Sequence, residues 1–354
     1  MIGQTNQIFN PDTLLLADLH LHERKEFGVM DGEISSRLKE GLSIIEQIGG
    51  LVDKHNISEV IVLGDIFELK DRVPNHVLVA FAESLHKIHS PIKVLLGNHD
   101  FKVKRYSSLK LFSLGDLFTL IDRPTYMKLS NGLRVGFLPF FREYTDFEFF
   151  WERLHNQSEF DLFCFHQAIP GVVYKSKNKI PGTFNLTMFR DTLYLAGHIH
   201  QHCQVGDKIM YLGSPYQVNF NEVGDKKYVW LLDSKIMKLR PVELDYPRFV
   251  TTNINEEVTD SVTGNYVKLI GEITPDKKPM VVQKREEVMS LGAKGVVTDI
   301  HYMREVKKRL DAKTSTENII KDYVKQASKS LTRHLQKDKL VALGESLLQE
   351  ARSL

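Results

Sequence analysis

Residues 94–100 read Val-Leu-Leu-Gly-Asn-His-Asp, a short apolar run followed by residues that can turn the chain and bind a cation. Continuous runs of this length, rich in Leu and β-branched residues, are typical of strands covered on both faces. Glycine lets the backbone turn sharply and approach an ion closely. The stretch therefore predicts a buried strand with Gly97, Asn98, His99 and Asp100 at its carboxyl end.

Four other apolar runs have the same character. They cover residues 14–17, 60–63, 162–165 and 193–196. Apolar residues at helical spacing predict helices over 38–55 and 74–89, which lie between these runs in the sequence. Strands that alternate with helices in this order predict a layered α/β fold.

The pattern changes twice further along the chain. Between residues 209 and 239 short alternating runs predict hairpin strands, and residues 1–244 form the expected first domain. A small α+β unit is expected over 245–300, with a helix over 281–291. Residues 301–354 predict two helices with apolar stripes.

The composition is that of an ordinary globular protein. The chain has 354 residues, 42% hydrophobic and 26% charged, with a net charge of +2. Since no window approaches about 18 consecutive apolar residues, no membrane span is expected. The first ten residues do not resemble a signal peptide. Two cysteines, Cys164 and Cys203, are too few for a disulfide framework, which predicts a reducing, cytoplasmic setting.

Five strand ends carry the residue types that bind metals. In chain order they are Asp18-Leu19-His20, Gly64-Asp65, Gly97-Asn98-His99-Asp100, His166 and Gly197-His198-Ile199-His200. Ligands bind at the carboxyl ends of strands in α/β sheets, so these segments are expected to converge. Each motif alone has an ordinary explanation, such as a turn or a core histidine. Their joint occurrence after buried strands predicts one metal site.

Seven side chains supply the oxygen and nitrogen donors of this predicted site. They are Asp18, His20, Asp65, Asn98, His166, His198 and His200. Seven donors without a thiolate exceed the needs of one tetrahedral ion and suit two cations that share a carboxylate. The mixture of imidazole, carboxylate and amide favours Mn²⁺, with Fe²⁺ or Zn²⁺ as alternatives and Mg²⁺ less suited to so much imidazole.

In this order the motifs resemble the calcineurin-like metallophosphoesterase superfamily, whose pattern is D-x-H, G-D, G-N-H-D, H and G-H-x-H. The resemblance implies a layered β-sandwich flanked by helices. It implies one ion held by Asp18, His20, Asp65 and His200, and a second held by Asp65, Asn98, His166 and His198. It also implies that His99 is a catalytic histidine outside the ligand set and that Asp100 orients it.

Two further segments resemble the SbcD subfamily, the prokaryotic and viral relatives of the meiotic recombination eleven nuclease. They are Gly64-Asp65-Ile66-Phe67 and Tyr211-Leu212-Gly213-Ser214-Pro215, the latter followed by Phe220 and Glu222. The resemblance implies a DNA exonuclease or endonuclease acting at DNA ends in double-strand-break repair, recombination or replication. It further implies a capping domain over 245–300, an SbcC-like coiled-coil ATPase partner for residues 301–354, and a homodimer within a heterotetramer.

Several residues are assigned more peripheral roles. Glu68 occupies a position that shapes the DNA end in the subfamily, and His22 is expected at the surface. Candidate DNA contacts are Lys102, Lys104, Arg105, Lys175, Lys177 and Lys179, although solvated lysine loops explain them equally well. Candidate partner contacts are Ile320, Val324, Leu331, Leu340, Leu343 and Leu347, unless the last helix packs onto its own domain.

Two other functions remain open at this level. The chain could be a phosphoesterase acting on a nucleotide, a phosphoprotein or another small phosphoester. It could also be an inactive scaffold, for which degenerate ligands would be the signature. The apolar face of Val77, Phe81 and Leu85 is either a dimer interface or the packing surface of a helix on a sheet.

Overall fold

The computed structural model describes residues 8–23, 28–103, 106–113, 117–172, 180, 192–303, 318, 320–321 and 337–353. The chain divides into two compact units. The first unit comprises residues 1–271 and 278–301, and the second comprises 272–277 and 302–354. The finer division at residues 244 and 300 stays a prediction.

One six-stranded sheet carries the strand ends of the first three motifs. Its order is β14-β13-β1-β4-β5-β6, with β1, β4, β5 and β6 mutually parallel and β13 antiparallel to β1. The strands are β1 (Thr13–Leu16), β4 (Glu59–Val62), β5 (Ile92–Leu95), β6 (Phe118–Ile121), β13 (Val229–Asp233) and β14 (Lys238–Val242).

A second six-stranded sheet carries the last two motifs. Its order is β11-β12-β10-β9-β8-β7, with β8, β9, β10 and β12 parallel and an antiparallel strand at each edge. The strands are β7 (Thr125–Lys128), β8 (Arg134–Leu138), β9 (Leu162–His166), β10 (Leu193–Gly197), β11 (Cys203–Val205) and β12 (Ile209–Tyr211).

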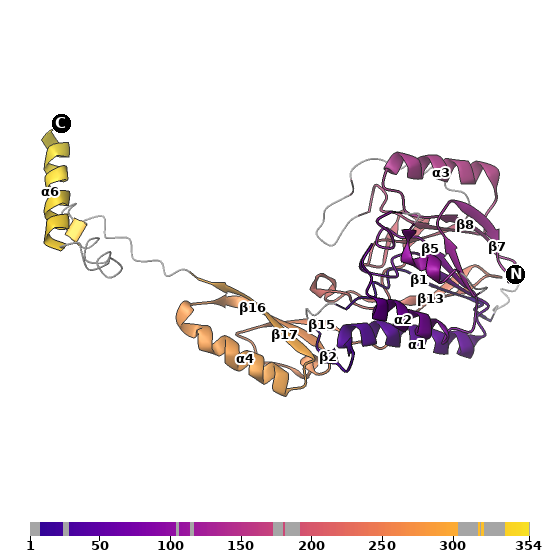
Figure 1. Ribbon diagram of the computed structural model, residues 1–354, viewed down its shortest axis with the longest axis horizontal. Coiled ribbons are helices and arrows are strands. Elements are labelled where there is room, and N and C mark those ends of the chain that lie inside the picture. Colours follow the sequence, from indigo (N-terminus) through magenta and orange to yellow (C-terminus); the bar gives the residue numbers. More distant parts are fainter. Residues whose placement is uncertain are drawn as a thin grey trace, which may run out of the picture. The chain divides into compact units, whose positions relative to one another are not determined.

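The two sheets pack face to face, and alternate residues of each strand serve different layers of the core. Leu15 and Leu195 meet between the sheets, whereas Leu14 packs under the helices on the outer face of the first sheet. Phe163 points the other way, toward a helix on the second sheet. Figure 1 shows α1 (Ser36–His55) and α2 (Asn75–Leu85) on one side of the sandwich and α3 (Tyr144–Gln157) on the other. The predicted layered α/β sandwich is confirmed.

Within the part of the chain that the structure describes, three helices cover the sandwich. α1 (Ser36–His55) begins where the Ser35 side chain accepts a hydrogen bond from the Leu38 backbone N–H at 3.2 Å. α2 (Asn75–Leu85) ends before the predicted residue 89. Val77 and Phe81 of α2 are buried against the first sheet, so this face packs onto the sheet and is not a dimer interface. The sequence patterns did not predict α3 (Tyr144–Gln157) or β6, β7 and β8.

Two smaller sheets complete the strands. β2 (Met30–Asp31) and β3 (Ile34–Ser35) form a short antiparallel pair before α1. β15 (Phe249–Asn253), β16 (Tyr266–Ile273) and β17 (Gly295–Tyr302) form a three-stranded sheet in that order, with β15 parallel to β16. α4 (Lys278–Ser290) packs on it through Val288, against Val267 and Leu269. This is the small α+β element predicted from the sequence.

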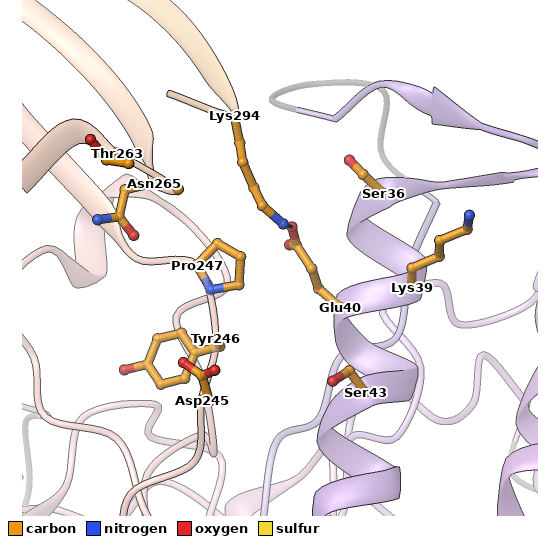
Figure 2. A pocket seen from close by; sticks show the side chains of 11 residues that line it. Ser36, Lys39, Glu40, Ser43, Asp245, Tyr246, Pro247, Thr263, Asn265 and Lys294 are labelled. Atoms are coloured by element: carbon orange, nitrogen blue, oxygen red, sulfur yellow. Dashed lines mark hydrogen bonds and ion pairs between the residues drawn. The ribbon is translucent and has the colours of Figure 1, made fainter. Parts of the chain in front are cut away.

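The small sheet is joined to α1 by a buried polar network. Glu40 accepts a hydrogen bond from the Tyr266 hydroxyl at 2.8 Å and lies 3.1 Å from the Lys294 ammonium. Its other oxygen is 2.5 Å from the guanidinium of Arg37. A polar cavity of about 550 Å³ opens beside this network, and Figure 2 shows the Lys294 and Glu40 side chains meeting across it.

The second unit contains helix α6 (Lys337–Ser353). Lys321 pairs with Glu345 of α6 at 3.1 Å, and Ile320 packs against the helix at Gly344. Leu343 and Leu347 are 58% and 57% exposed, while Leu340 is half-buried. Val324 and Leu331 lie outside the described residues. Within the described part of the chain, no helix has both the length and the hydropathy to cross a membrane.

Candidate metal centre

The five motifs meet where the strands of both sheets end. Asp18, Asp65 and Asn98 follow β1, β4 and β5 of the first sheet, while His166 and His198 terminate or follow β9 and β10 of the second. The site lies between the two sheets, and the Asp18 carboxylate links them by accepting a hydrogen bond from the His198 backbone N–H at 3.0 Å.

The backbone around the donors is held in an uncommon conformation. Among the described residues, Asp18, His20, Asp65 and His198 have φ values of 55°, 47°, 56° and 86°. Non-glycine residues seldom adopt positive φ, and such strain concentrates at functional sites. Six non-glycine residues have positive φ in the described chain, so four of the six are candidate ligands.

Two glycines let the loops approach each other. A Cβ at Gly97 would lie 2.2 Å from Asp65 Oδ1, and one at Gly64, where φ is +90°, would lie 2.4 Å from His166 Nδ1. Neither position can carry a side chain without displacing a donor. The glycines in G-D and G-N-H-D are therefore part of the packing of the site.

The first donor group gathers around two facing imidazoles. Asp18, His20 and His200 each place one candidate ligand atom within 4.8 Å of the others. His20 Nε2 lies 2.9 Å from His200 Nε2 and 3.6 Å from Asp65 Oδ2. Asp18 and His20 are fully buried, so these donors face one another and not solvent.

The second donor group contains Asp65, whose carboxylate also lies close to His20 of the first group. Asp65, His166 and His198 form another trio within 4.8 Å, and Asp65 Oδ2 is 3.4 Å from His166 Nε2. The Asn98 side-chain oxygen lies 3.0 Å from His166 Nε2 and 2.6 Å from His198 Nδ1. Because Asp65 Oδ2 faces both His20 and His166, this carboxylate is placed to bridge two cations.

The charges of the site act strongly on its titratable groups. Burial would raise the pKa of Asp65, but the nearby His166 and His20 rings hold that pKa well below its usual range. Burial would lower the pKa of His166, yet the charges of Asp65 and Asp18 raise it to about 9. Burial and the neighbouring His166 lower the pKa of His198 to about 3. The carboxylates of Asp18 and Asp65 thus favour a positive charge between the two donor groups.

The histidine rings are oriented by acceptors on their other nitrogens. His20 Nδ1 is 2.7 Å from Glu68 Oε2, His200 Nδ1 is 2.9 Å from Glu222 Oε1, and His166 Nδ1 is 2.5 Å from the Leu63 carbonyl oxygen. The acceptors beside His200 and His166 favour a proton on Nδ1 and so direct Nε2 toward a cation, an arrangement typical of metal-ligating histidines. The Glu68 carboxylate lies on the corresponding side of His20. The donor set therefore fits two divalent cations.

His99 lies beside the two donor groups. Its Nδ1 is 2.8 Å from the Glu68 backbone carbonyl oxygen, which can only accept, so the proton is on Nδ1 and Nε2 is the free nitrogen. A ligand atom of His99 also lies within 4.8 Å of those of His20 and Asp65. Its side chain is 29% exposed, which leaves the ring accessible from outside.

Asp100 has a different task from the one expected. Its carboxylate accepts hydrogen bonds from the backbone N–H groups of Gly97 and Asp65 at 2.8 Å and of Ile66 at 2.9 Å. It thereby ties the loop after β5 to the loop after β4 and holds the backbone of Asp65. Burial and the negative charge of Asp65 raise the pKa of Asp100 to about 6. The carboxylate acts on these loops and not on the His99 imidazole.

Other expected residues have mixed outcomes. His22 is buried, not at the surface, with Nδ1 2.6 Å from the His20 carbonyl oxygen. Lys102 is exposed close to the metal-binding loop, whereas Lys104, Arg105, Lys175, Lys177 and Lys179 lie outside the described residues. Glu68 contacts His20, so its position is that of a carboxylate behind a metal ligand.

Sequence reasoning missed three residues around the site. Phe140 stacks on the His198 ring at 5.9 Å between centroids, and Arg142 lies over the Phe101 ring at 5.8 Å. Lys227 is fully buried and contacts the residues behind His200. The apolar run 135–138 before Phe140 was an available signal, but nothing in the sequence near Lys227 points to a distant histidine.

The fold and the donor set are those of a metal-dependent hydrolase. The chain belongs to the calcineurin-like phosphoesterase family, whose sequence model matches residues 12–202, more than half of the chain. This family uses divalent metal ions to hydrolyse phosphoesters, and all seven predicted donors lie within the matched segment.

Two solved structures are similar to this chain at low sequence identity. One is the nuclease MPE of Pseudomonas putida, with 15% identity over 66% of this chain and 88% of that chain and a TM-score of 0.32. The other is GAP50, the anchor in the inner membrane complex of Plasmodium, with 12% identity over 80% and 96% and a TM-score of 0.40. No curated protein sequence matches the chain. Substrate and partners must therefore be argued from the residues themselves.

Proposed function

We propose that this protein is the DNA nuclease subunit of an SbcCD-like complex and hydrolyses phosphodiester bonds at DNA ends with two Mn²⁺ ions. Family membership supports the hydrolysis of a phosphoester. The sequence element Tyr211-Leu212-Gly213-Ser214-Pro215 supports the finer assignment, together with the surroundings of the donor groups.

The observation that carries the proposal is an aromatic cavity beside the candidate ligands. It has a volume of about 380 Å³ and is lined by Phe101, Lys102, Val103, Phe140, Phe141 and Arg142. Phe140 separates it from the donors, because its ring stacks on His198 and meets His166 edge-on. Nucleobases stack on aromatic rings in a sequence-tolerant way, at about 1–3 kcal/mol per base. Phe101 is buried, so the half-buried Phe140 and Phe141 are the rings proposed to meet a base.

Two cations at the rim of the cavity suit phosphate groups. The Lys102 side chain is 68% exposed, and its ion pair with Asp71 is of the exposed kind that contributes little stability. Arg142 donates a hydrogen bond to the Lys102 carbonyl oxygen, which fixes the guanidinium over Phe101. Such contacts give sequence-independent affinity for a nucleic-acid backbone.

The roles of the reacting groups follow from the geometry. Two divalent cations would activate a water for in-line attack on phosphorus and neutralise charge on the attacking and leaving oxygens. His99 lies 29% exposed beside the donor groups. In its imidazolium form, with a proton on each ring nitrogen, it can give the Nε2 proton to the leaving oxygen, a contribution of about 10²–10⁴ in rate. The Glu68 backbone carbonyl oxygen holds the His99 ring, while Asp100 holds the loops after β4 and β5 together.

The proposal extends to partners through α6. Leu343 and Leu347 are exposed on one side of this helix, as expected of a helix that binds another protein through apolar anchors. The partner proposed for it is an SbcC-like coiled-coil ATPase, in a complex built around a homodimer of this chain.

The test compares two substrates in the presence of Mn²⁺. The full chain, alone and with an SbcC-type ATPase, is incubated with end-labelled linear duplex DNA and with a small phosphate bis-ester. We expect shortening of the DNA. Cleavage of the bis-ester with intact DNA in both arms would contradict the nuclease assignment and favour a small-phosphoester hydrolase, and loss of both activities would favour an inactive scaffold.

A pair of variants tests the cavity. Arg142→Gln should weaken DNA binding and reduce the slope of log affinity against log salt by about 1, because one phosphate contact is lost. Hydrolysis of the bis-ester should stay unchanged. The matched control is Arg285→Gln, an exposed arginine on α4. Equal effects of the two variants on DNA binding would remove the cavity from the proposal.

A further inference from the structure

His200 is contacted on its ring and on its backbone by residues that lie outside residues 12–202, the segment that matches the family model. Its ring Nδ1 is 2.9 Å from Glu222 Oε1, and its backbone carbonyl oxygen accepts a hydrogen bond from Lys227 Nζ at 2.8 Å. The Ser214 backbone N–H donates to the same carbonyl oxygen at 3.0 Å. Both the direction of the ring and the position of the backbone are thus fixed.

Glu222 and Lys227 also hold each other. Glu222 Oε2 is 2.6 Å from Lys227 Nζ and accepts a hydrogen bond from the Val218 backbone N–H at 3.2 Å. Lys227 Nζ also donates to the Ser214 hydroxyl at 2.9 Å and lies 4.0 Å from Asp225 Oδ2. The lysine side chain is 0% exposed, so its ammonium has no access to water. Its three protons instead have three acceptors in the protein: Glu222 Oε2, the His200 carbonyl oxygen and the Ser214 hydroxyl.

A buried ion pair of this kind is poor evidence of a role in stability. Removing a lysine and a glutamate from water is expensive, and apolar residues of similar volume often stabilise a protein as well or better. The pair is more readily explained by what it touches. Its two groups converge on one residue, His200, which is a candidate metal ligand.

The pair is braced from its other side. The Gln217 side chain donates to the Glu222 carbonyl oxygen at 2.9 Å and accepts from the Phe249 backbone N–H at 2.7 Å. Arg37 donates to the Gln217 carbonyl oxygen at 3.2 Å. The segment that carries Glu222 is therefore fixed to both α1 and β15.

We propose that Glu222 and Lys227 are positioning residues of the metal centre, which hold the His200 imidazole with its proton on Nδ1 and its Nε2 facing His20. The Glu68 carboxylate lies 2.7 Å from His20 Nδ1, and the Nε2 atoms of His20 and His200 lie 2.9 Å apart. A metal cation bound by both Nε2 lone pairs would make this close approach favourable. This inference depends on the metal site and not on whether the substrate is DNA.

The experiment measures Mn²⁺ binding to the full chain by calorimetry. The wild type should bind two equivalents. Glu222→Ala should weaken one of them by about 10–100-fold, the usual effect of losing such a partner, and leave the other unchanged. Glu222→Gln keeps an oxygen that can accept a hydrogen bond from His200 Nδ1. Its Mn²⁺ affinity should lie between those of the wild type and Glu222→Ala. Lys227→Met should also weaken one equivalent.

The matched control is Glu59→Gln. Glu59 is as buried as Glu222, but its carboxylate accepts hydrogen bonds from Ser130 and lies near Lys93. Both Mn²⁺ affinities should be unchanged in this variant, even where its melting temperature falls. Should Lys227→Met fail to fold, the graded pair at Glu222 carries the test. Wild-type binding of both equivalents by Glu222→Ala would overturn the proposal, as would equal weakening of both.

A spectroscopic readout separates positioning from general stability. Two neighbouring Mn²⁺ ions give an exchange-coupled electron paramagnetic resonance spectrum, whereas one isolated ion gives six lines. At two equivalents the wild type and Glu59→Gln should give the coupled spectrum, and Glu222→Ala the six-line one. A coupled spectrum from Glu222→Ala at the same metal concentration would contradict the proposal.

Discussion

Glu68 shows how much one side chain behind a ligand can decide. Its carboxylate lies 2.7 Å from His20 Nδ1 and its backbone carbonyl oxygen holds His99. Glu68→Gln keeps the backbone contact and loses the charge that favours the Nδ1 proton of His20. We expect Mn²⁺ affinity to fall by about 10-fold or more. Calorimetric titration measures this, with Glu83→Gln on the exposed side of α2 as the control; equal affinities in the two variants would contradict the role.

Gly97 is a second single residue on which the geometry of the site depends. A Cβ there would lie 2.2 Å from Asp65 Oδ1, so Gly97→Ala must push the bridging carboxylate aside. We expect a loss of about 1–3 kcal/mol in the free energy of unfolding and loss of one metal equivalent. Gly50→Ala is the control, since nothing lies within 4 Å of a Cβ there. Because alanine replaces glycine inside a helix, the free energy of unfolding should rise by about 0.5–1 kcal/mol. Two bound equivalents in Gly97→Ala would refute the steric argument.

At the scale of elements, α1 depends on how it begins. The Ser35 side chain satisfies the Leu38 backbone N–H, and both residues are buried. Ser35→Ala leaves that donor without its partner and should lower the free energy of unfolding by about 1 kcal/mol, as measured by denaturant titration. Ser43→Ala, an exposed position within the same helix, should be neutral or slightly stabilising. A loss at Ser43 as large as that at Ser35 would argue against a capping effect.

The elements that could be predicted from the sequence are those whose residues face apolar layers on both sides. β1, β4, β5, β9 and β10 read as continuous apolar runs because each lies inside the sandwich. β7, with an alternating half-buried and exposed pattern at a sheet edge, gives no such run. α3 was missed because its buried face is aromatic: Phe147 and Trp151 have lower helix propensity than Leu, and tertiary packing against Phe163 decides the conformation.

The candidate site could be predicted as a set of residues but not as a geometry. The order of the five motifs indicated seven donors, and the structure brings all seven together. Nothing in the sequence indicated that Asp100 binds backbone N–H groups of two loops, because those loops meet only after β4 and β5 pair. The Glu222–Lys227 pair was hidden for the same reason, since its contact with His200 depends on the fold of the intervening strands.

At the scale of the whole molecule, metal binding should stabilise the fold. A ligand that binds only the folded state adds about 2.7 kcal/mol per ion at a concentration 100 times its Kd. We expect Mn²⁺ to raise the melting temperature and a chelator to reverse the change, as followed by calorimetry.

The same measurement separates the roles of His99 and the ligands. His99→Asn should lose hydrolysis and keep the shift in melting temperature, because His99 is expected to act on the substrate. His166→Asn should lose much of the shift. An absent shift in His99→Asn would instead place His99 among the ligands, as its closeness to His20 and Asp65 permits.

Arg37 has a consequence for anyone who wishes to shorten this protein. Its guanidinium lies 5.0 Å from the ring centres of both Phe249 and Tyr266 and is only 1% exposed, although it belongs to α1. Cutting the chain after Leu244 would remove both aromatic rings, together with the Lys294 ammonium and the Tyr266 hydroxyl that contact Glu40. In the remaining fragment, Arg37 and Glu40 would become exposed to water on α1. The small sheet is therefore needed to keep these charged side chains buried, and a shortened protein should retain it.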